Sequence, residues 1–165
     1  MHLKIIIISD THGNYQALQK VTLLHEDADM FIHLGDGERE LYQLFNTLPW
    51  TERKFYCLKG NCDYSQDMTL FRTLILDLPY DHKLLAAHGD QFQVKFGTAR
   101  IAYEARQNQA DIVLYGHTHV SDCRYEDGLY ILNPGSLSLP RDGKRPSYAL
   151  LDISEKGILP NIVFR

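Results

Sequence analysis

Seven residues with metal-binding side chains each follow a short apolar segment of the chain. They are Asp10, His12, Asp36, Asn61, His88, His117 and His119. The pair His117 and His119 is the most specific signal, because an i, i+2 pair in an extended loop can direct two imidazoles to neighbouring ions. Taken separately, the Asp10 and His12 pair or the isolated Asp36 would also suit a helix cap or an ordinary turn. The whole set predicts a metal site only if its loops converge.

The segments before these residues alternate between strand and helix patterns. Short apolar runs predict strands over residues 3–8, 30–34 and 54–58. Apolar residues at helical spacing predict helices over residues 15–25 and 41–48, the first with Asn14 as its N-cap. This alternation builds a parallel sheet, and ligands bind beyond the carboxyl ends of such strands. The loops that carry the seven residues are therefore expected to meet.

The second half of the chain is richer in hairpins. Residues 70–78 and 83–87 predict a hairpin, residues 98–108 a helix and residues 111–115 a further strand. Strand-like runs separated by turns follow over residues 121–125, 129–132, 147–153 and 158–164. We therefore expect an α/β fold in which a two-sheet β core lies between helices.

Composition narrows the class of protein. A chain of 165 residues fits one domain, expected over residues 1–165. Its net charge of −4 argues against a broad electrostatic grip on nucleic acid or on anionic membranes. No apolar run approaches the roughly 20 residues that cross a bilayer, and the start lacks the pattern of a signal peptide. Three cysteines without a CxxC pair favour a reducing, cytoplasmic location.

Taken in order, the motifs of the chain resemble one known family. They are Asp10-x-His12, Gly35-Asp36, Gly60-Asn61-Cys62-Asp63, His88-Gly89 and Gly116-His117-Thr118-His119. This series, within residues 3 to about 153, is similar to the calcineurin-like metallophosphoesterase superfamily. Cys62, the turn at residues 133–136 and the small size resemble its compact prokaryotic phosphodiesterases, a group that includes the retromer subunit that kept the fold. The resemblance implies a four-layer α/β/β/α sandwich, with two mixed sheets flanked by helices and a two-metal site at one edge.

The resemblance also implies which residue would bind which ion. One metal would take Asp10, His12 and His119, and the other would take Asn61, His88 and His117. Asp36 would bridge both, and Asp36, His88 and His117 would act in catalysis through the metals. Four imidazoles, two carboxylates and one amide oxygen suit Mn²⁺, Fe²⁺, Co²⁺, Ni²⁺ or Zn²⁺ better than Ca²⁺ or Mg²⁺, with Mn²⁺ expected first. Two such ions roughly 3.5–4 Å apart can hold a bridging hydroxide as the nucleophile.

Several positions depart from the family pattern or have an open role. Many relatives carry His where this chain has Cys62, so the leaving group departs without that acid or another residue supplies the proton. We favour a third interpretation, in which Cys62 is a small buried residue. Asp63 and Arg141 are candidates for contacts behind the ligands or with phosphate, or else surface salt-bridge partners. Asp90 stands where close relatives often carry a second His, and His33 is expected in the core or behind the ligands.

These observations predict a metal-dependent hydrolase of small or cyclic phosphodiesters. The charge of the centre weakly favours diesters, because two divalent ions, two carboxylates and a hydroxide leave one positive charge. The alternative is a catalytically weak or inactive scaffold for protein interaction, which the complete set of metal-binding residues disfavours. A nuclease on long polymers is disfavoured by the net charge and the absence of a basic run, so no stable nucleic-acid binding is expected. No membrane partner and no specificity pocket are expected. A homodimer is compatible with the resemblance.

Overall fold

The apolar run at residues 5–8 forms part of strand β1 (His2–Ile8), which is buried on both faces. Successive side chains of a strand point to opposite faces. Ile6 and Ile8 therefore pack in one apolar cluster with helical residues, whereas Ile5 and Ile7 pack in a second cluster with residues of another sheet. A continuous apolar run, rather than an alternating one, is what a strand covered on both sides requires.

A computed structural model of the chain describes residues 2–64 and 68–165. The first of its two sheets contains β1, β2 (Met30–His33), β3 (Phe55–Cys57), β9 (Ser147–Ser154) and β10 (Gly157–Phe164). The strands lie in the order β10–β9–β1–β2–β3. β1, β2 and β3 run parallel, and β9 is antiparallel to its neighbours β1 and β10. The sheet is therefore mixed.

The second sheet contains β4 (Thr73–Asp77), β5 (Lys83–Ala87), β6 (Ile112–Leu114), β7 (Ser121–Glu126) and β8 (Leu129–Pro134). Its strand order is β4–β5–β6–β8–β7. β5, β6 and β8 run parallel, while the edge strands β4 and β7 are antiparallel to their neighbours. The hairpin predicted from residues 70–87 is thus confirmed as the β4–β5 pair.

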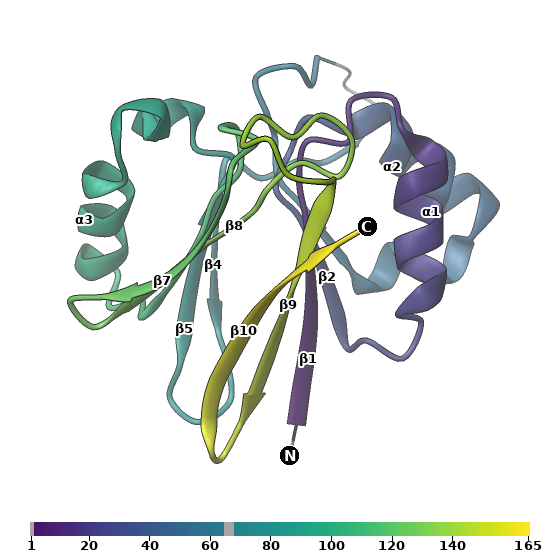
Figure 1. Cartoon of the computed structure of the whole chain (residues 1–165). Helices are drawn as coiled ribbons and strands as arrows, with labels where there is room; N and C mark the ends of the chain where they lie inside the picture. The colour runs from purple at the N-terminus through teal and green to yellow at the C-terminus, as the bar shows by residue number, and fades with distance from the viewer. Residues whose placement is uncertain (1, 65–67) are drawn as a thin grey trace.

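Helices cover the outer faces of the two sheets. They are α1 (Tyr15–Leu24), α2 (Glu38–Thr47) and α3 (Ala99–Gln107), with shorter 3-10 helices η1 (Pro49–Lys54), η2 (Asp90–Phe92) and η3 (Val94–Phe96). Figure 1 shows α1 and α2 on one side of the paired sheets and α3 on the other. The expected four-layer α/β/β/α sandwich is confirmed. Within the described residues, no helix is long and apolar enough to cross a membrane.

Parallel pairing brings the carboxyl ends of the central strands to one end of the molecule. β1, β2 and β3 end there in the first sheet, as do β5 and β6 in the second. Figure 1 shows the loops that follow these strands gathered at the top of the sandwich. An isolated parallel bridge between Leu58 and Phe71 extends the β3 edge at this end. The fold therefore places the predicted ligand loops together.

Several predicted elements have bounds that differ from the observed ones by one to three residues. The helix predicted from residue 41 begins at Glu38, because its first turn is held by contacts from a distant loop that are described below. The strand predicted from residue 54 begins at Phe55, after a 3-10 turn that starts with Pro49. The strand predicted from residue 70 begins at Thr73, because Phe71 pairs with the end of β3 instead of β5. The predicted cap is confirmed, since Asn14 Oδ1 accepts from Ala17 N at 3.1 Å.

We expect Leu85→Ala to lower the free energy of unfolding by about 3 kcal/mol, because Leu85 is fully buried and its loss leaves a cavity in the core. Leu159→Ala is the matched control, since this strand leucine is 66% exposed, and we expect it to change stability by less than about 1 kcal/mol. Urea unfolding of both variants measures the difference. Equal losses of stability in the two variants would show that Leu85 does not belong to the apolar core.

Candidate metal centre

Five of the seven predicted ligands have left-handed backbone conformations. The φ angles are 55° at Asp10, 39° at His12, 57° at Asp36, 65° at His117 and 59° at His119. Such angles are uncommon for residues other than glycine, and each costs on the order of 1–3 kcal/mol unless the surroundings enforce it. Their concentration in the loops that follow β1, β2 and β6 indicates that the chain holds these side chains in place for a purpose other than stability.

The first group of ligand atoms comes from Asp10, His12 and His119. The Nε2 atoms of His12 and His119 lie 3.1 Å apart, and Asp10 Oδ1 lies 3.2 Å from His119 Nε2 and 3.7 Å from His12 Nε2. His119 Nδ1 donates to the carbonyl of Leu139 at 2.7 Å, so its Nε2 presents a lone pair to the group. Asp10 Oδ1 is buried and has no hydrogen-bond partner among the described residues.

The second group comes from His88, Asn61 and His117. His88 Nε2 lies 3.2 Å from Asn61 Oδ1 and 3.2 Å from His117 Nδ1. His88 Nδ1 donates to the carbonyl of Leu34 at 2.8 Å, which again leaves Nε2 with a lone pair. Asn61 Nδ2 contacts Cys62 Sγ at 3.3 Å, which turns the amide oxygen toward His88. Two acceptor atoms, His88 Nε2 and Asn61 Oδ1, thus face each other, and His117 Nδ1 lies beside them.

Asp36 lies between the two groups. Its Oδ2 is 3.7 Å from His12 Nε2 and 3.5 Å from His88 Nε2. Its Oδ1 accepts from the backbone N–H of Cys62 at 2.8 Å, which fixes the orientation of the carboxylate. Asp10 is held in the same way, because its Oδ2 accepts from Ser9 Oγ at 2.6 Å and from His117 N at 3.1 Å. Each carboxylate therefore has one anchored oxygen and one oxygen directed at imidazole nitrogens.

This arrangement fits a divalent metal centre. Acceptor atoms that converge without a hydrogen between them repel each other, and a cation placed among them turns that repulsion into attraction. In each of three sets of side chains, the ligand atoms lie within 4.8 Å of one another. The sets are Asp10, His12 and His119; His12, Asp36 and Cys62; and Asp10, Asp36 and His88. Nitrogen and oxygen donors with neutral imidazoles suit a transition-metal ion. The unpartnered Asp10 Oδ1 is the atom that most directly requires one.

The same groups shift the pKa values of one another. Burial opposes the charge of Asp10, but His119 and His12 outweigh it and lower the pKa of this carboxyl. Burial likewise opposes the charge of Asp36, whose pKa is lowered by His88. Asp10 raises the pKa of His12, and for His88 the effect of burial is outweighed by Asp36, so its pKa is also raised. The carboxylates are therefore ionised at neutral pH, and protons compete with a metal ion for the imidazoles.

Asp63 holds two of the ligand loops together. The residue is buried, its Oδ2 accepts from Asp36 N at 2.7 Å and Gly60 N at 2.8 Å, and its Oδ1 accepts from Gly37 N and Glu38 N, both at 3.0 Å. The N-cap position of α2, Gly37, has no capping side chain, so Asp63 supplies the acceptor from a separate loop. With four N–H donors on its carboxylate, Asp63 positions Asp36 and is not a surface salt-bridge partner.

His33 links the Asp36 loop to the loop of Asp10 and His12. It is fully buried, as expected, and burial lowers its pKa, so the ring is neutral. Its Nδ1 accepts from Gly35 N at 3.2 Å, and its Nε2 therefore donates to Thr11 Oγ1 at 3.2 Å. Thr11 Oγ1 in turn lies 3.5 Å from the carbonyl of Asp36. The loop of Asp10 and His12 is thus tied to the loop of Asp36.

Sequence reasoning missed the supports at residues 136–139. Ser136 Oγ donates to the carbonyl of Asp10 at 2.7 Å, and Ser138 Oγ contacts the same carbonyl at 3.2 Å. The carbonyl of Leu139 orients His119, as described above. The sequence does show a turn at residues 133–136. Its contact with Asp10, however, joins residues that are more than 120 positions apart, and no local sequence pattern reveals such a contact.

Close packing of the ligand loops explains one of the glycines in these motifs. A side chain at Gly60 would overlap the carboxylate and backbone nitrogen of Asp36. The loops after β2 and β3 approach each other closely at this point, which brings Asp36 against Cys62 and Asp63. Only glycine allows that approach.

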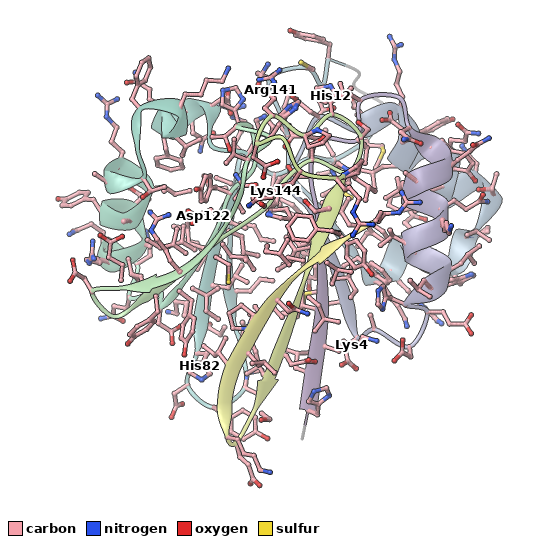
Figure 2. The ribbon with its side chains drawn as sticks, in the orientation of Figure 1. Lys4, His12, His82, Asp122, Arg141 and Lys144 are labelled. Carbon is pink, nitrogen blue, oxygen red and sulfur yellow. The ribbon has the colours of Figure 1, made fainter. Side chains whose placement is uncertain are left out.

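Three other predicted positions are not among the seven predicted ligands. Cys62 is exposed, so the interpretation as a small buried residue was wrong; it lies on the open side of Asp36 and His12. Arg141 is exposed at the same end of the molecule as His12, as Figure 2 shows, and its backbone N–H donates to His119 O at 2.9 Å. Asp90 is directed to Arg72, whose Nη2 lies 3.3 Å from Asp90 Oδ2.

A cavity of about 550 Å³ opens beside the ligands, contrary to the expectation of a site without a pocket. It lies between the loop after β1, the first turn of α2 and the loop after β3. Its lining comprises His12, Gly13, Asp36, Gly37, Glu38, Arg39, Glu40, Cys62, Asp63 and Tyr64. The sequence could not show it, because the three segments that form it are far apart in the chain.

Comparison with known proteins gives consistent matches across the chain. Residues 3–156 match the family model of the calcineurin-like phosphoesterase superfamily domain. A probable metallophosphoesterase, YsnB of Bacillus subtilis, is 34% identical, with 92% of this chain and 85% of the relative covered. The phosphodiesterase YfcE of Escherichia coli is 29% identical, with 91% and 88% covered.

Solved structures agree with the fold. The crystal structure of a predicted phosphoesterase from Streptococcus pneumoniae has a TM-score of 0.83 and 28% identity, and the match covers 99% of this chain and 90% of that one. Vacuolar Protein Sorting 29 of Cryptosporidium parvum has a TM-score of 0.73 at 16% identity, with 98% and 97% covered. The second likeness concerns the fold alone.

We expect Asp63→Asn to lower the free energy of unfolding by about 3 kcal/mol and to weaken Mn²⁺ binding at least about tenfold. The amide NH₂ would face two of the four N–H donors that now reach the carboxylate, and the Asp36 loop would lose its support. Urea unfolding and calorimetric metal titration measure the two effects. Asp77→Asn, at a side chain 86% exposed, is the control and should change neither. Similar results for both variants would exclude the positioning role of Asp63.

Proposed function

This chain belongs to the calcineurin-like phosphoesterase superfamily, and from that membership we propose that it is a phosphodiesterase that uses two divalent metal ions to hydrolyse small or cyclic phosphodiesters. The observation that carries the proposal is the place of Asp36 Oδ2, 3.7 Å from His12 Nε2 and 3.5 Å from His88 Nε2. One carboxylate oxygen within reach of both ligand groups is the geometry of a bridging ligand. The phosphodiesterase name of the relative YfcE supports the substrate class.

We assign three protein ligands to each ion and share Asp36 between them. The first ion would be held by Asp10, His12 and His119, and the second by Asn61, His88 and His117. The fixed tautomers of His88 and His119 support this assignment, because the backbone carbonyls that accept from Nδ1 leave Nε2 free for a metal. The nitrogen-rich donor set favours Mn²⁺, with Fe²⁺, Co²⁺, Ni²⁺ or Zn²⁺ as alternatives.

When bound, the two ions would supply a water-derived nucleophile near neutral pH and positive charge for the phosphoryl oxygens. The chain contributes the orientation of the ligands, because the anchored oxygens of Asp10 and Asp36 prevent rotation of either carboxylate. Arg141, exposed at this end of the molecule, offers a guanidinium to a phosphate oxygen. Burial and the neighbouring Asp36 raise the pKa of the Cys62 thiol.

Charge favours a diester over a monoester. Two divalent ions, the carboxylates of Asp10 and Asp36, and a hydroxide would leave a single positive charge, which a diester monoanion neutralises. The cavity beside the centre adds the carboxyl groups of Glu38, Glu40 and Asp63. A monoester dianion would bring excess negative charge next to these side chains, so the diester is preferred.

We expect metal-stripped protein to lose hydrolysis of bis(4-nitrophenyl) phosphate and to regain it with Mn²⁺, at a higher kcat/KM than for 4-nitrophenyl phosphate. Asp36→Ala and His117→Ala should each lower kcat for the diester by about three orders of magnitude, since each removes a ligand. His82→Ala is the matched control, because His82 lies at the opposite end of the molecule from His12 in Figure 2 and contacts Asp111. It should leave kcat unchanged.

The outcomes separate the parts of the proposal. Wild-type turnover by Asp36→Ala with metal present would contradict the bridging assignment. Faster hydrolysis of the monoester would contradict the substrate class. A folded protein that binds metal but hydrolyses neither ester would instead favour the alternative function, a scaffold for protein interaction.

A further inference from the structure

The cavity beside the ligands has walls of contrasting chemistry. Its lining includes His12 and Asp36, where the reacting phosphoryl group would bind. The same cavity is lined by Tyr64, which is 81% exposed. Gly13 and Gly37, which have no side chains, also belong to the lining. A substituent on a phosphate held at the centre would therefore extend toward a tyrosine ring.

The acidic wall of the cavity is already engaged in holding the fold. Asp63 accepts four backbone N–H groups, and Glu40 Oε1 accepts from Gly13 N. With Glu38, these residues place three carboxyl groups in the cavity lining in addition to the ligand Asp36, and Arg39 is the one Lys or Arg in that lining. Such a wall repels an anion and offers few free donors to one. The occupant is accordingly neutral.

The volume and the ring together indicate a planar group. About 550 Å³ accommodates an aryl ring or a nucleobase with part of its sugar. An exposed tyrosine ring binds such a group by stacking, which contributes roughly 1–3 kcal/mol per base in single-stranded nucleic-acid complexes. The exposed thiol of Cys62, which also lines the cavity, adds a polarizable contact.

We infer that this cavity is a subsite for a neutral, planar organic substituent of the phosphodiester, bound against Tyr64, and that it discriminates against substituents that carry a further negative charge. The inference rests on the proposed function, since it takes the phosphoryl group to lie at the metal centre. Its substrate class is an aryl or nucleoside phosphodiester, and nucleoside polyphosphates are excluded by the carboxylates of Glu38, Glu40 and Asp63.

The experiment measures binding directly, with ligands that the enzyme does not hydrolyse. Calorimetry of the Mn²⁺-loaded protein compares methylphosphonate, phenylphosphonate and 4-carboxyphenylphosphonate. Because the same two compounds are used throughout, a change in the phenyl-to-methyl affinity ratio between wild type and variant reports the contribution of Tyr64. We expect a ratio of about ten in the wild type and in Tyr64→Phe, and a ratio below about two in Tyr64→Ala. The carboxyphenyl compound should bind at least about fivefold more weakly than phenylphosphonate.

A matched control is Tyr103→Ala, because Tyr103 is 62% exposed on α3, the helix on the other side of the sandwich. It should keep the wild-type ratio. The inference is overturned if Tyr64→Ala keeps the ratio, if the wild type does not prefer phenylphosphonate, or if the carboxyphenyl compound binds as tightly. Failure of the proposed function would be recognised by a different result. The protein would bind metal and keep its circular dichroism spectrum but would not hydrolyse the diester, whatever the phosphonate ratio.

Discussion

The structure depends on the enforced proximity of acceptor atoms that would otherwise separate. His12 and His119 bring their Nε2 atoms to 3.1 Å, and the amide oxygen of Asn61 lies 3.2 Å from His88 Nε2. Unless a proton is shared between the two atoms, such contacts are unfavourable until a cation is bound. The left-handed backbone at five of the ligands adds to the unfavourable terms. The remainder of the chain must therefore supply enough stability to hold the loops in this arrangement.

That stability comes from two sources with different ranges. The apolar strands determine where each loop begins. Their burial stabilises the fold through two apolar clusters, one between the sheets and one between a sheet and its helices. Hydrogen bonds from Asp63, His33 and Ser136 then fix each loop against the next. Because these buried groups lie outside the two ligand groups, the loops can be held in register before an ion binds, which lowers the entropy lost on binding it.

Much of this could be predicted from residue types and spacing, and the reason is physical. The run at residues 5–8 is apolar at every position, which only a strand covered on both faces explains. The other ligand motifs also follow short strands, of which β3 before Asn61 is only half-buried. The pattern cannot show contacts between loops. Asp63 accepts from Asp36 N and Gly60 N only because two loops approach each other closely, and neither this approach nor the exposure of Cys62 is visible in the spacing of residues.

The carboxylates that build the site also determine what can enter it. Asp63 and Glu40 hold the backbone around the ligands, and their negative charge forms the wall of the adjoining cavity. A substitution that removed the charge of Asp63 to admit an anionic substituent would leave the buried N–H groups of Gly37 and Gly60 without an acceptor. Stability and the charge preference of the cavity are thus coupled through the same side chains. Tyr64 lies outside this network of carboxylates, so changes of substituent preference are most easily reached through its exposed ring.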